Sequence, residues 1–288
     1  MPFTLSHPAA VLPLLRRPFS RTALVAGAVA PDLPYFLATT GLPVSAQSWY
    51  EPFANATTTH GVSGVVTVTL PYALLLWALL RAGCRPLASL LPRSVSLPLP
   101  LPLPGPAGVP VRRAGWVVLS ALIGIATHLV WDAFTHVDGF VVTRTPWLAS
   151  TSVGGLTWAR ALQHVSTIGG LAAIALYAWR GRNRLLTAPE PDRRRPAGGP
   201  RRQVLLAMGL FTAAGAVAHA WRWLAGPEAE RGGLSSAGLA EGVLSDAAKG
   251  AGAGLIVALT LYVLAWWIRH AVTEARSGRG GAGPVHGD

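Results

Sequence analysis

The chain has 288 residues, of which 51% are hydrophobic and only 12% are charged. Soluble globular proteins carry about twice that share of charged residues, so the composition excludes an ordinary soluble domain and indicates a surface that faces lipid. The single cysteine, Cys84, excludes an intramolecular disulfide and a cysteine-rich zinc site, and the net charge of +12 comes from arginines between apolar runs, which favours membrane topology over a nucleic-acid partner.

The N-terminal region contains two apolar stretches, residues 5–15 and 22–30, that are each too short to cross a bilayer. The sequence RRPFSR separates them, so we expect two half-length helices that form a hairpin. One alternative is a single span over residues 22–42, kinked at its prolines. Another is a twin-arginine export signal whose cleavage at the end of the second stretch would remove His7.

Five further apolar runs have the length of roughly 20 residues that crosses a bilayer. Each run contains at most two charged residues or histidines. The runs are residues 61–80, 114–135, 157–179, 204–221 and 250–268. We therefore predict an all-α, polytopic helical membrane protein with five long transmembrane helices and the N-terminal half-helix hairpin.

The basic residues alternate along the chain in a way that predicts its orientation. Of the 24 basic residues, 19 lie in residues 16–21, 81–113, 180–202 and 269–279. Loops rich in arginine stay on the cytoplasmic side of a membrane. We therefore predict a multi-pass protein of a bacterial cytoplasmic (inner) membrane, in contact with lipids. Its C-terminus would be cytoplasmic, and His60, His136 and His164 would face the outer side.

We predict one helical membrane domain over residues 1–272, followed by a disordered tail over residues 273–288. Two cytoplasmic loops within the domain are of low complexity. Residues 85–113 are rich in proline, which favours an extended polyproline conformation. Residues 180–202 are rich in arginine and form a solvated spacer or lie against anionic lipid headgroups.

The segment THLVWDAFTH, residues 127–136, places polar side chains at the end of an apolar run. Residues four apart share one face of a helix with a rise of about 6 Å, so His128 and Asp132 could bind one ion together. His136 would lie about 12 Å from His128 and is less suited to the same ion. It could bind a second ion or the substrate, or transfer protons.

A carboxylate in hydrocarbon costs several kcal/mol unless it is paired, so Asp132 needs partners from other segments. Four residues offer such partners near the outer ends of their segments: His7, Asp32, His60 and His164. Imidazoles and carboxylates form a nitrogen and oxygen donor set that suits a divalent metal. Zinc is the first choice, with manganese or iron as alternatives.

A structural explanation stays open for each of these residues. His128 and Asp132 could form a hydrogen-bonded pair that fixes helix packing. His60 and His164 could be interfacial histidines without a chemical role. His219, His270 and His286 lack the same local pattern, and we interpret them as structural or as part of a polar tail.

Four segments in order, MPFTLSHPAAVLPL, AGAVAPDLPYF, TTTHG and THLVWDAFTH, closely resemble a bacterial family of integral membrane proteins, domain of unknown function 4184. The resemblance covers most of the chain. More distantly, the order His, Asp, His and HxxxD is similar to inner-membrane metal-dependent hydrolases and to the zinc-dependent phospholipase C fold, where such residues hold zinc. These similarities imply metal ligands, which are His7, Asp32, His60, His128 and Asp132.

Together these observations favour a metal-dependent hydrolase that acts on a phosphoester or lipid-linked substrate near the outer leaflet. A bound ion would lower the pKa of water to about 7, and His136 and His164 would serve as acid–base groups. The alternative is a non-enzymatic membrane protein. It would be a metal or proton carrier, or a structural component whose His/Asp stripe only locks helix packing.

Overall fold

A computed structural model describes residues 4–38, 51–91, 110–151, 156–186, 201–226 and 236–280. The described residues form helices and no strands, which confirms the all-α prediction. Within these residues, five helices are long and apolar enough to cross a membrane, and each overlaps one predicted span: Val62–Ser89, Val111–Thr135, Trp158–Arg182, Arg201–Ala225 and Gly242–Arg276. The protein is therefore a multi-pass helical membrane protein. The choice of membrane and the cytoplasmic C-terminus stay predictions.

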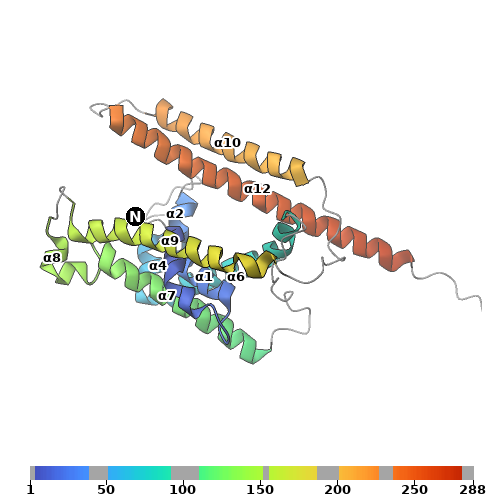
Figure 1. The fold of residues 1–288 in the computed structure, drawn as a ribbon, viewed down its shortest axis with the longest axis horizontal. Coiled ribbons are helices and arrows are strands. Elements are labelled where there is room, and N and C mark those ends of the chain that lie inside the picture. Colours follow the sequence, from blue (N-terminus) through green and yellow to red (C-terminus); the bar gives the residue numbers. More distant parts are fainter. Residues whose placement is uncertain are drawn as a thin grey trace, which may run out of the picture. The chain divides into compact units, whose positions relative to one another are not determined.

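The helices follow one another along the chain as Figure 1 colours them. In order they are η1 (Thr4–Leu14), α1 (Arg21–Val29), η2 (Ala30–Asp32), α2 (Leu33–Ala38), α3 (Glu51–Ala54), α4 (Ala56–His60), α5 (Val62–Gly64), η3 (Val65–Thr69), α6 (Leu70–Ser89), α7 (Val111–Thr135), η4 (Val142–Arg144), α8 (Pro146–Ala149), α9 (Trp158–Leu186), α10 (Arg201–Ala225) and α12 (Ser236–Gly280). The first long span is thus built from α5, η3 and α6.

Three sequence predictions concern the loops and the tail. Most of the proline-rich loop and most of the arginine-rich loop lie outside the described residues, which stop at residue 91 and at residue 186. Helix α12 continues to Gly280, so residues 273–280 are helical and not disordered as predicted. The physical reason is that no proline interrupts α12, since the next one in the sequence is Pro284.

The helices divide into two compact units, and the single domain of the sequence analysis stays a prediction. Unit 1 contains residues 1–81 and 94–189, and unit 2 contains residues 82–93 and 190–288. Each unit is described separately below. All seven predicted site residues belong to unit 1.

The predicted N-terminal hairpin is present in unit 1. Helices η1 and α1 pack against each other and against α7, and η1 also packs against α9. Pro8 and Pro13 lie inside η1, where each lacks the N–H that an α-helix needs, and the segment winds as a tighter 3-10 helix. Pro31 follows α1, and the short turn η2 there presents Asp32.

The crossing of α1 over α7 depends on two glycines. A Cβ atom on Gly27 would lie 2.1 Å from the carbonyl oxygen of Ala121, and one on Gly124 would lie 2.2 Å from that of Leu24. Real Cβ atoms cannot approach so closely, so only glycine lets the two backbones touch. On α7, Gly124 lies one helical turn before His128, so the contact holds α1 close to this histidine.

A tight turn sets the place of His60 at the end of α4. The side chain of Asn55 caps this helix by accepting a hydrogen bond from the N–H of Thr57 at 2.8 Å. A Cβ on Gly64 would lie 1.7 Å from the carbonyl oxygen of Thr58, so the chain turns back at this glycine. The wide π turn η3 then precedes Pro71, which cannot donate an α-helical hydrogen bond.

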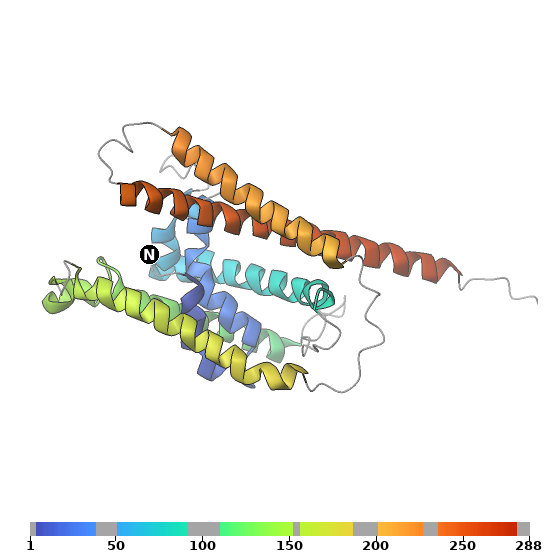
Figure 2. The same ribbon diagram turned by 45° about the horizontal axis from the view of Figure 1, so that its top comes forward.

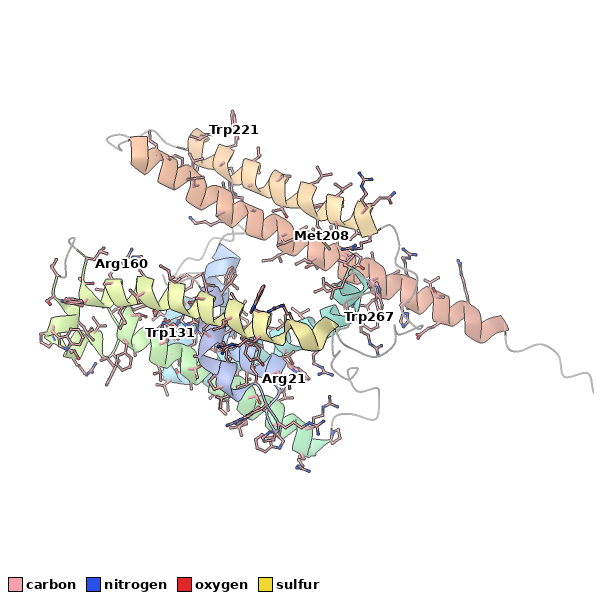
Figure 3. The ribbon with its side chains drawn as sticks, viewed as in Figure 1. Arg21, Trp131, Arg160, Met208, Trp221 and Trp267 are labelled. Atoms are coloured by element: carbon pink, nitrogen blue, oxygen red, sulfur yellow. The ribbon has the colours of Figure 1, made fainter. Side chains whose placement is uncertain are left out.

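Unit 2 is dominated by a pair of helices, α10 and α12, which lie side by side in Figures 1 and 2. They also meet through glycines, because a Cβ on Gly215 would lie 2.1 Å from the carbonyl oxygen of Gly250. Met208 is buried on α10, whereas Trp221 projects outward with 70% of its surface exposed (Figure 3). Trp267 of α12 donates a hydrogen bond to the carbonyl oxygen of Ala82.

Candidate metal centre

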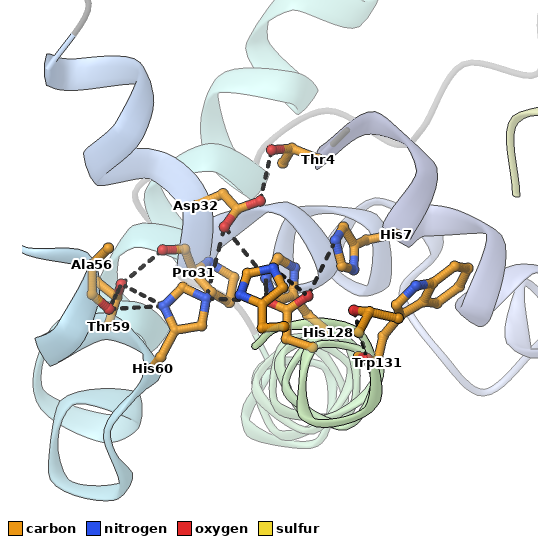
Figure 4. A network of polar contacts seen from close by, with 12 residues as sticks. Thr4, His7, Pro31, Asp32, Ala56, Thr59, His60, His128 and Trp131 are labelled. Atoms are coloured by element: carbon orange, nitrogen blue, oxygen red, sulfur yellow. Dashed lines mark hydrogen bonds and ion pairs between the residues drawn. The ribbon is translucent and has the colours of Figure 1, made fainter. Parts of the chain in front are cut away.

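Six of the seven predicted site residues meet in unit 1 and form what we call the His/Asp cluster (Figure 4). They come from η1, η2, α4 and the C-terminal end of α7, and they are His7, Asp32, His60, His128, Asp132 and His136. His164 is exposed on α9, and no contact in the described part of the chain joins it to the cluster. Its predicted acid–base role therefore has no geometric support.

Four members of the cluster surround one point. One ligand atom each from Asp32, His60, His128 and Asp132 lies within 4.8 Å of the others, as a metal site requires. The Nε2 atom of His128 is 3.1 Å from Asp132 Oδ2 and 3.5 Å from Asp32 Oδ1. The Nε2 atom of His60 is 3.4 Å and 3.7 Å from the same two oxygens. Ligands that bind zinc tetrahedrally at about 2.0–2.1 Å are roughly 3.3 Å apart, so this group could hold a metal ion.

The two histidines of this group are oriented by backbone carbonyls. Nδ1 of His128 donates to the carbonyl oxygen of Ala28 at 2.8 Å, and Nδ1 of His60 donates to that of Ala56 at 2.8 Å. Since a carbonyl oxygen only accepts, Nδ1 carries a proton in both rings, and it is Nε2 that each ring directs at the carboxylates. Histidines that bind metals are held in this way.

Threonines that the sequence analysis missed hold the remaining parts of the group. The hydroxyl of Thr4 donates to Asp32 Oδ2 at 2.6 Å, which leaves Oδ1 directed at the histidines. The hydroxyl of Thr59 donates to the carbonyl oxygen of Pro31 at 2.7 Å and so ties the turn of Asp32 to the helix of His60. The spacing of Thr4 and His7, three residues apart on one short helix, is the sequence signal that could have indicated Thr4.

The opposite oxygen of Asp132 faces a second pair of histidines. Asp132 Oδ1 is 3.7 Å from Nε2 of His7 and 3.6 Å from Nε2 of His136. The separation of about 12 Å expected from His128 to His136 assumed a continuous helix. In the structure α7 ends at Thr135, and the extended backbone of His136 lets its ring turn back toward Asp132.

The cluster is buried, and several of its atoms lack a hydrogen-bond partner. His7, Asp32 and His128 are at most 2% exposed, and Asp132 is 6% exposed. Within the described residues no hydrogen bond reaches either oxygen of Asp132, Nε2 of His128, Nε2 of His136 or either ring nitrogen of His7. Unpaired buried polar atoms cost about 1–3 kcal/mol each, so the arrangement is unfavourable by itself and favourable around a cation.

Two members of the cluster that lie outside the membrane spans have shifted pKa values. Burial lowers the pKa of the His7 imidazole to about 4, and repulsion by the His128 ring, which stacks 3.9 Å away, acts in the same direction. Burial raises the pKa of Asp32, but the His128 imidazole and the Thr4 hydroxyl outweigh it and hold the pKa below its ordinary value. At neutral pH a neutral His7 and an ionised Asp32 both have lone pairs free for a metal.

The fold and the cluster define a multi-pass helical membrane protein with a buried group of histidines and aspartates that could hold a metal ion. The chain belongs to the family described as Domain of unknown function (DUF4184), whose model matches residues 1–264. This confirms the family named from the sequence. No curated protein and no solved structure matches the chain, and the more distant similarity to metal-dependent hydrolases stays a prediction.

Proposed function

We propose that the protein is a metal-dependent hydrolase whose metal ion, zinc in the first place, is held by Asp32, His60, His128 and Asp132. One observation carries the proposal. Two imidazoles with anchored Nδ1 atoms direct Nε2 at two carboxylates, with nitrogen–oxygen distances of 3.1–3.7 Å that match the edges of a zinc tetrahedron. A divalent ion there would polarise a substrate and lower the pKa of a bound water to about 7.

The residues of the chain divide the remaining tasks among themselves. The carbonyl oxygens of Ala28 and Ala56 fix the tautomers of the two histidines, and Thr4 orients Asp32. The side chain of His60 is 23% exposed, whereas that of His128 is fully buried. Substrate would therefore approach from the side of His60, while His128 and the crossing of α1 over α7 exclude water from the other side.

The same contacts weigh against a cluster that only locks helix packing. A packing role needs short hydrogen bonds between the partners, yet Asp132 Oδ1 lies 3.7 Å from His7 and 3.6 Å from His136, and neither ring nitrogen of His7 has a hydrogen-bond partner in the described residues. Without a cation, the close approach of two carboxylates would be destabilising. The proposed substrate is a phosphoester or a lipid-linked molecule near the outer leaflet, since helices that can cross a bilayer would bring the cluster close to lipid.

The test is hydrolysis by detergent-purified protein that has been loaded with zinc. Three probes separate the substrate classes: bis(p-nitrophenyl) phosphate, p-nitrophenyl acetate and phospholipid vesicles. The proposal predicts release from a phosphate ester that EDTA abolishes and that an Asp32→Asn variant reduces at least 100-fold. His219→Ala, a substitution in unit 2, is the control. A folded, zinc-loaded wild type that hydrolyses none of the probes faster than Asp32→Asn would contradict the proposal and leave a carrier or structural role.

A further inference from the structure

The carboxylate of Asp132 has histidines on both of its sides. Oδ2 faces His60 and His128, at 3.4 Å and 3.1 Å. Oδ1 faces His7 and His136, at 3.7 Å and 3.6 Å. The two histidine pairs lie at different oxygens of Asp132, so the carboxylate could bind one ion at each oxygen. A carboxylate with separate donors at each oxygen is the arrangement of a bridging ligand in a two-metal site.

The Oδ1 side has the properties of a site for an ion and not of a polar surface. His7 is 1% exposed, and neither of its ring nitrogens has a hydrogen-bond partner in the described structure. Nε2 of His136 and Oδ1 of Asp132 are likewise unpartnered and buried. Two unpartnered imidazoles therefore face one unpartnered carboxylate oxygen, which is costly unless a cation binds there.

Ring packing holds the side chain of His7, and a backbone hydrogen bond holds the turn of His136. His7 is sandwiched between the His128 ring, whose centroid is 3.9 Å away, and the Trp131 ring at 5.4 Å. Trp131 is fixed in turn by a hydrogen bond from its Nε1 to the hydroxyl of Ser166 on α9. The N–H of His136 donates to the carbonyl oxygen of Asp132, so the backbone of His136 is tied to the same turn as its neighbouring carboxylate.

We infer that His7, His136 and Asp132 form a second metal site, and that Asp132 bridges it to the ion of the Asp32, His60 and His128 group. This inference rests on the proposed function and extends it. His136 is then a ligand and not the acid–base group that the sequence suggested. Its side chain is 22% exposed, so the second site lies on the open part of the cluster together with His60.

The second ion would select the substrate by charge. With one divalent ion, the two carboxylates of Asp32 and Asp132 balance its charge and the centre is neutral. With two ions the same carboxylates leave a net charge of about +2 in a buried place, where electrostatic interactions are strong. Such a centre would prefer an anionic phosphoester to an uncharged carboxylic ester.

The test is the zinc content of detergent-purified protein that is stripped with chelator, reloaded with zinc alone and measured by mass spectrometry. We expect about two zinc ions per wild-type chain and about one in His136→Ala, with two retained in the control His219→Ala. His7→Ala should also retain about one. X-ray absorption spectra of the wild type should contain a zinc–zinc scattering path at roughly 3.5–4 Å that both variants lose.

The outcomes separate this inference from the proposed function. One zinc ion in the wild type that His136→Ala and His7→Ala both retain would overturn the second site and leave the hydrolase proposal standing. Loss of all zinc in His136→Ala, while the variant keeps the elution volume and helicity of the wild type, would also overturn it, because the ions would then not be separate. Absence of zinc from the wild type would overturn both.

Discussion

The two units of the molecule use the same packing device with different results. In unit 1 the glycines Gly27 and Gly124 bring α1 and α7 into backbone contact, and in unit 2 Gly215 and Gly250 do the same for α10 and α12. One turn beyond Gly124 lies His128, whose ring reaches the carbonyl oxygen of Ala28 across the contact. Unit 2 has no equivalent cluster in its described residues.

Unit 2 nevertheless contains two histidines within its helices. His219 lies against Gly250, where its Cβ would be 2.7 Å from a Cβ on that glycine, and no carboxylate pairs with it in the described part. His270 lies 3.2 Å from Glu274, a partner one turn along the same helix that is 72% exposed. Close helix contact therefore does not make a site by itself. Buried carboxylates from a second segment are needed, as Asp32 provides in unit 1.

The largest effect is expected from Gly124→Ala. Its new Cβ would lie 2.2 Å from the carbonyl oxygen of Leu24, so α1 and α7 must separate and Ala28 must leave His128. We expect the free energy of unfolding to fall by about 1–3 kcal/mol, measured by thermal unfolding. Most of the bound zinc should also be lost, measured by mass spectrometry.

Two matched substitutions sharpen this prediction. Gly115→Ala lies on the same helix with nothing within 4 Å of its new Cβ, so it should leave zinc binding unchanged and stabilise the helix by about 0.5–1 kcal/mol. Gly215→Ala should destabilise unit 2 without changing the zinc content. Equal zinc loss in all three variants would refute the link between the α1–α7 contact and the cluster.

Removal of the metal should affect the two units unequally. An ion at 1,000 times its dissociation constant stabilises the folded state by about 4 kcal/mol, and its ligands all belong to unit 1. Chelation should therefore speed amide hydrogen exchange in η1, η2, α4 and the end of α7, and leave α10 and α12 unchanged. Exchange that rises equally in both units, or in neither, would argue against a metal centre confined to unit 1.

A moderate effect is expected from Thr4→Val, which removes the hydrogen bond to Asp32 Oδ2 while keeping the size of the side chain. Loss of a group that orients a metal ligand lowers metal affinity by about 10–100-fold. Zinc titration with a competing chelator measures this. Thr260→Val is the control, because the hydroxyl of Thr260 bonds only within α12. Unchanged affinity in Thr4→Val would mean that Asp32 is positioned by its backbone alone.

The smallest effect is expected from His164→Ala. The ring is exposed and has no contact with the cluster in the described residues, so zinc content and hydrolysis should each stay within about twofold of the wild type. A larger loss of hydrolysis at normal zinc content would restore the acid–base role that the sequence suggested for this residue.

The sequence was sufficient for the spans and for most of the cluster. Apolar runs of membrane length are strong signals of spans, because lipid does not tolerate exposed backbone. Aspartates within or beside such runs are strong signals of a site, because lipid does not tolerate unpaired charge. Asp32, His60, His128 and Asp132 therefore stood out. The hairpin was also predictable, since residues 5–15 and 22–30 are each too short to cross a bilayer and RRPFSR separates them.

Other features depended on tertiary contacts that one sequence does not encode locally. The return of His136 toward Asp132 needs α7 to end at Thr135, and the exposure of His164 on α9 could not be read from its position in the sequence. The anchoring of His128 on Ala28 joins residues 100 positions apart and requires the glycine contact. Helix ends and side-chain directions of this kind are set by packing and not by propensity.

The most direct test of the account is the metal content of purified wild-type protein beside a His128→Ala/Asp132→Ala double variant, each checked for helicity and elution volume. The account predicts about two zinc ions per wild-type chain and none in a folded double variant, because these two residues supply both sites. A folded wild type that binds no divalent metal, or a double variant that binds as much as the wild type, would contradict it. The His/Asp cluster would then serve helix packing alone.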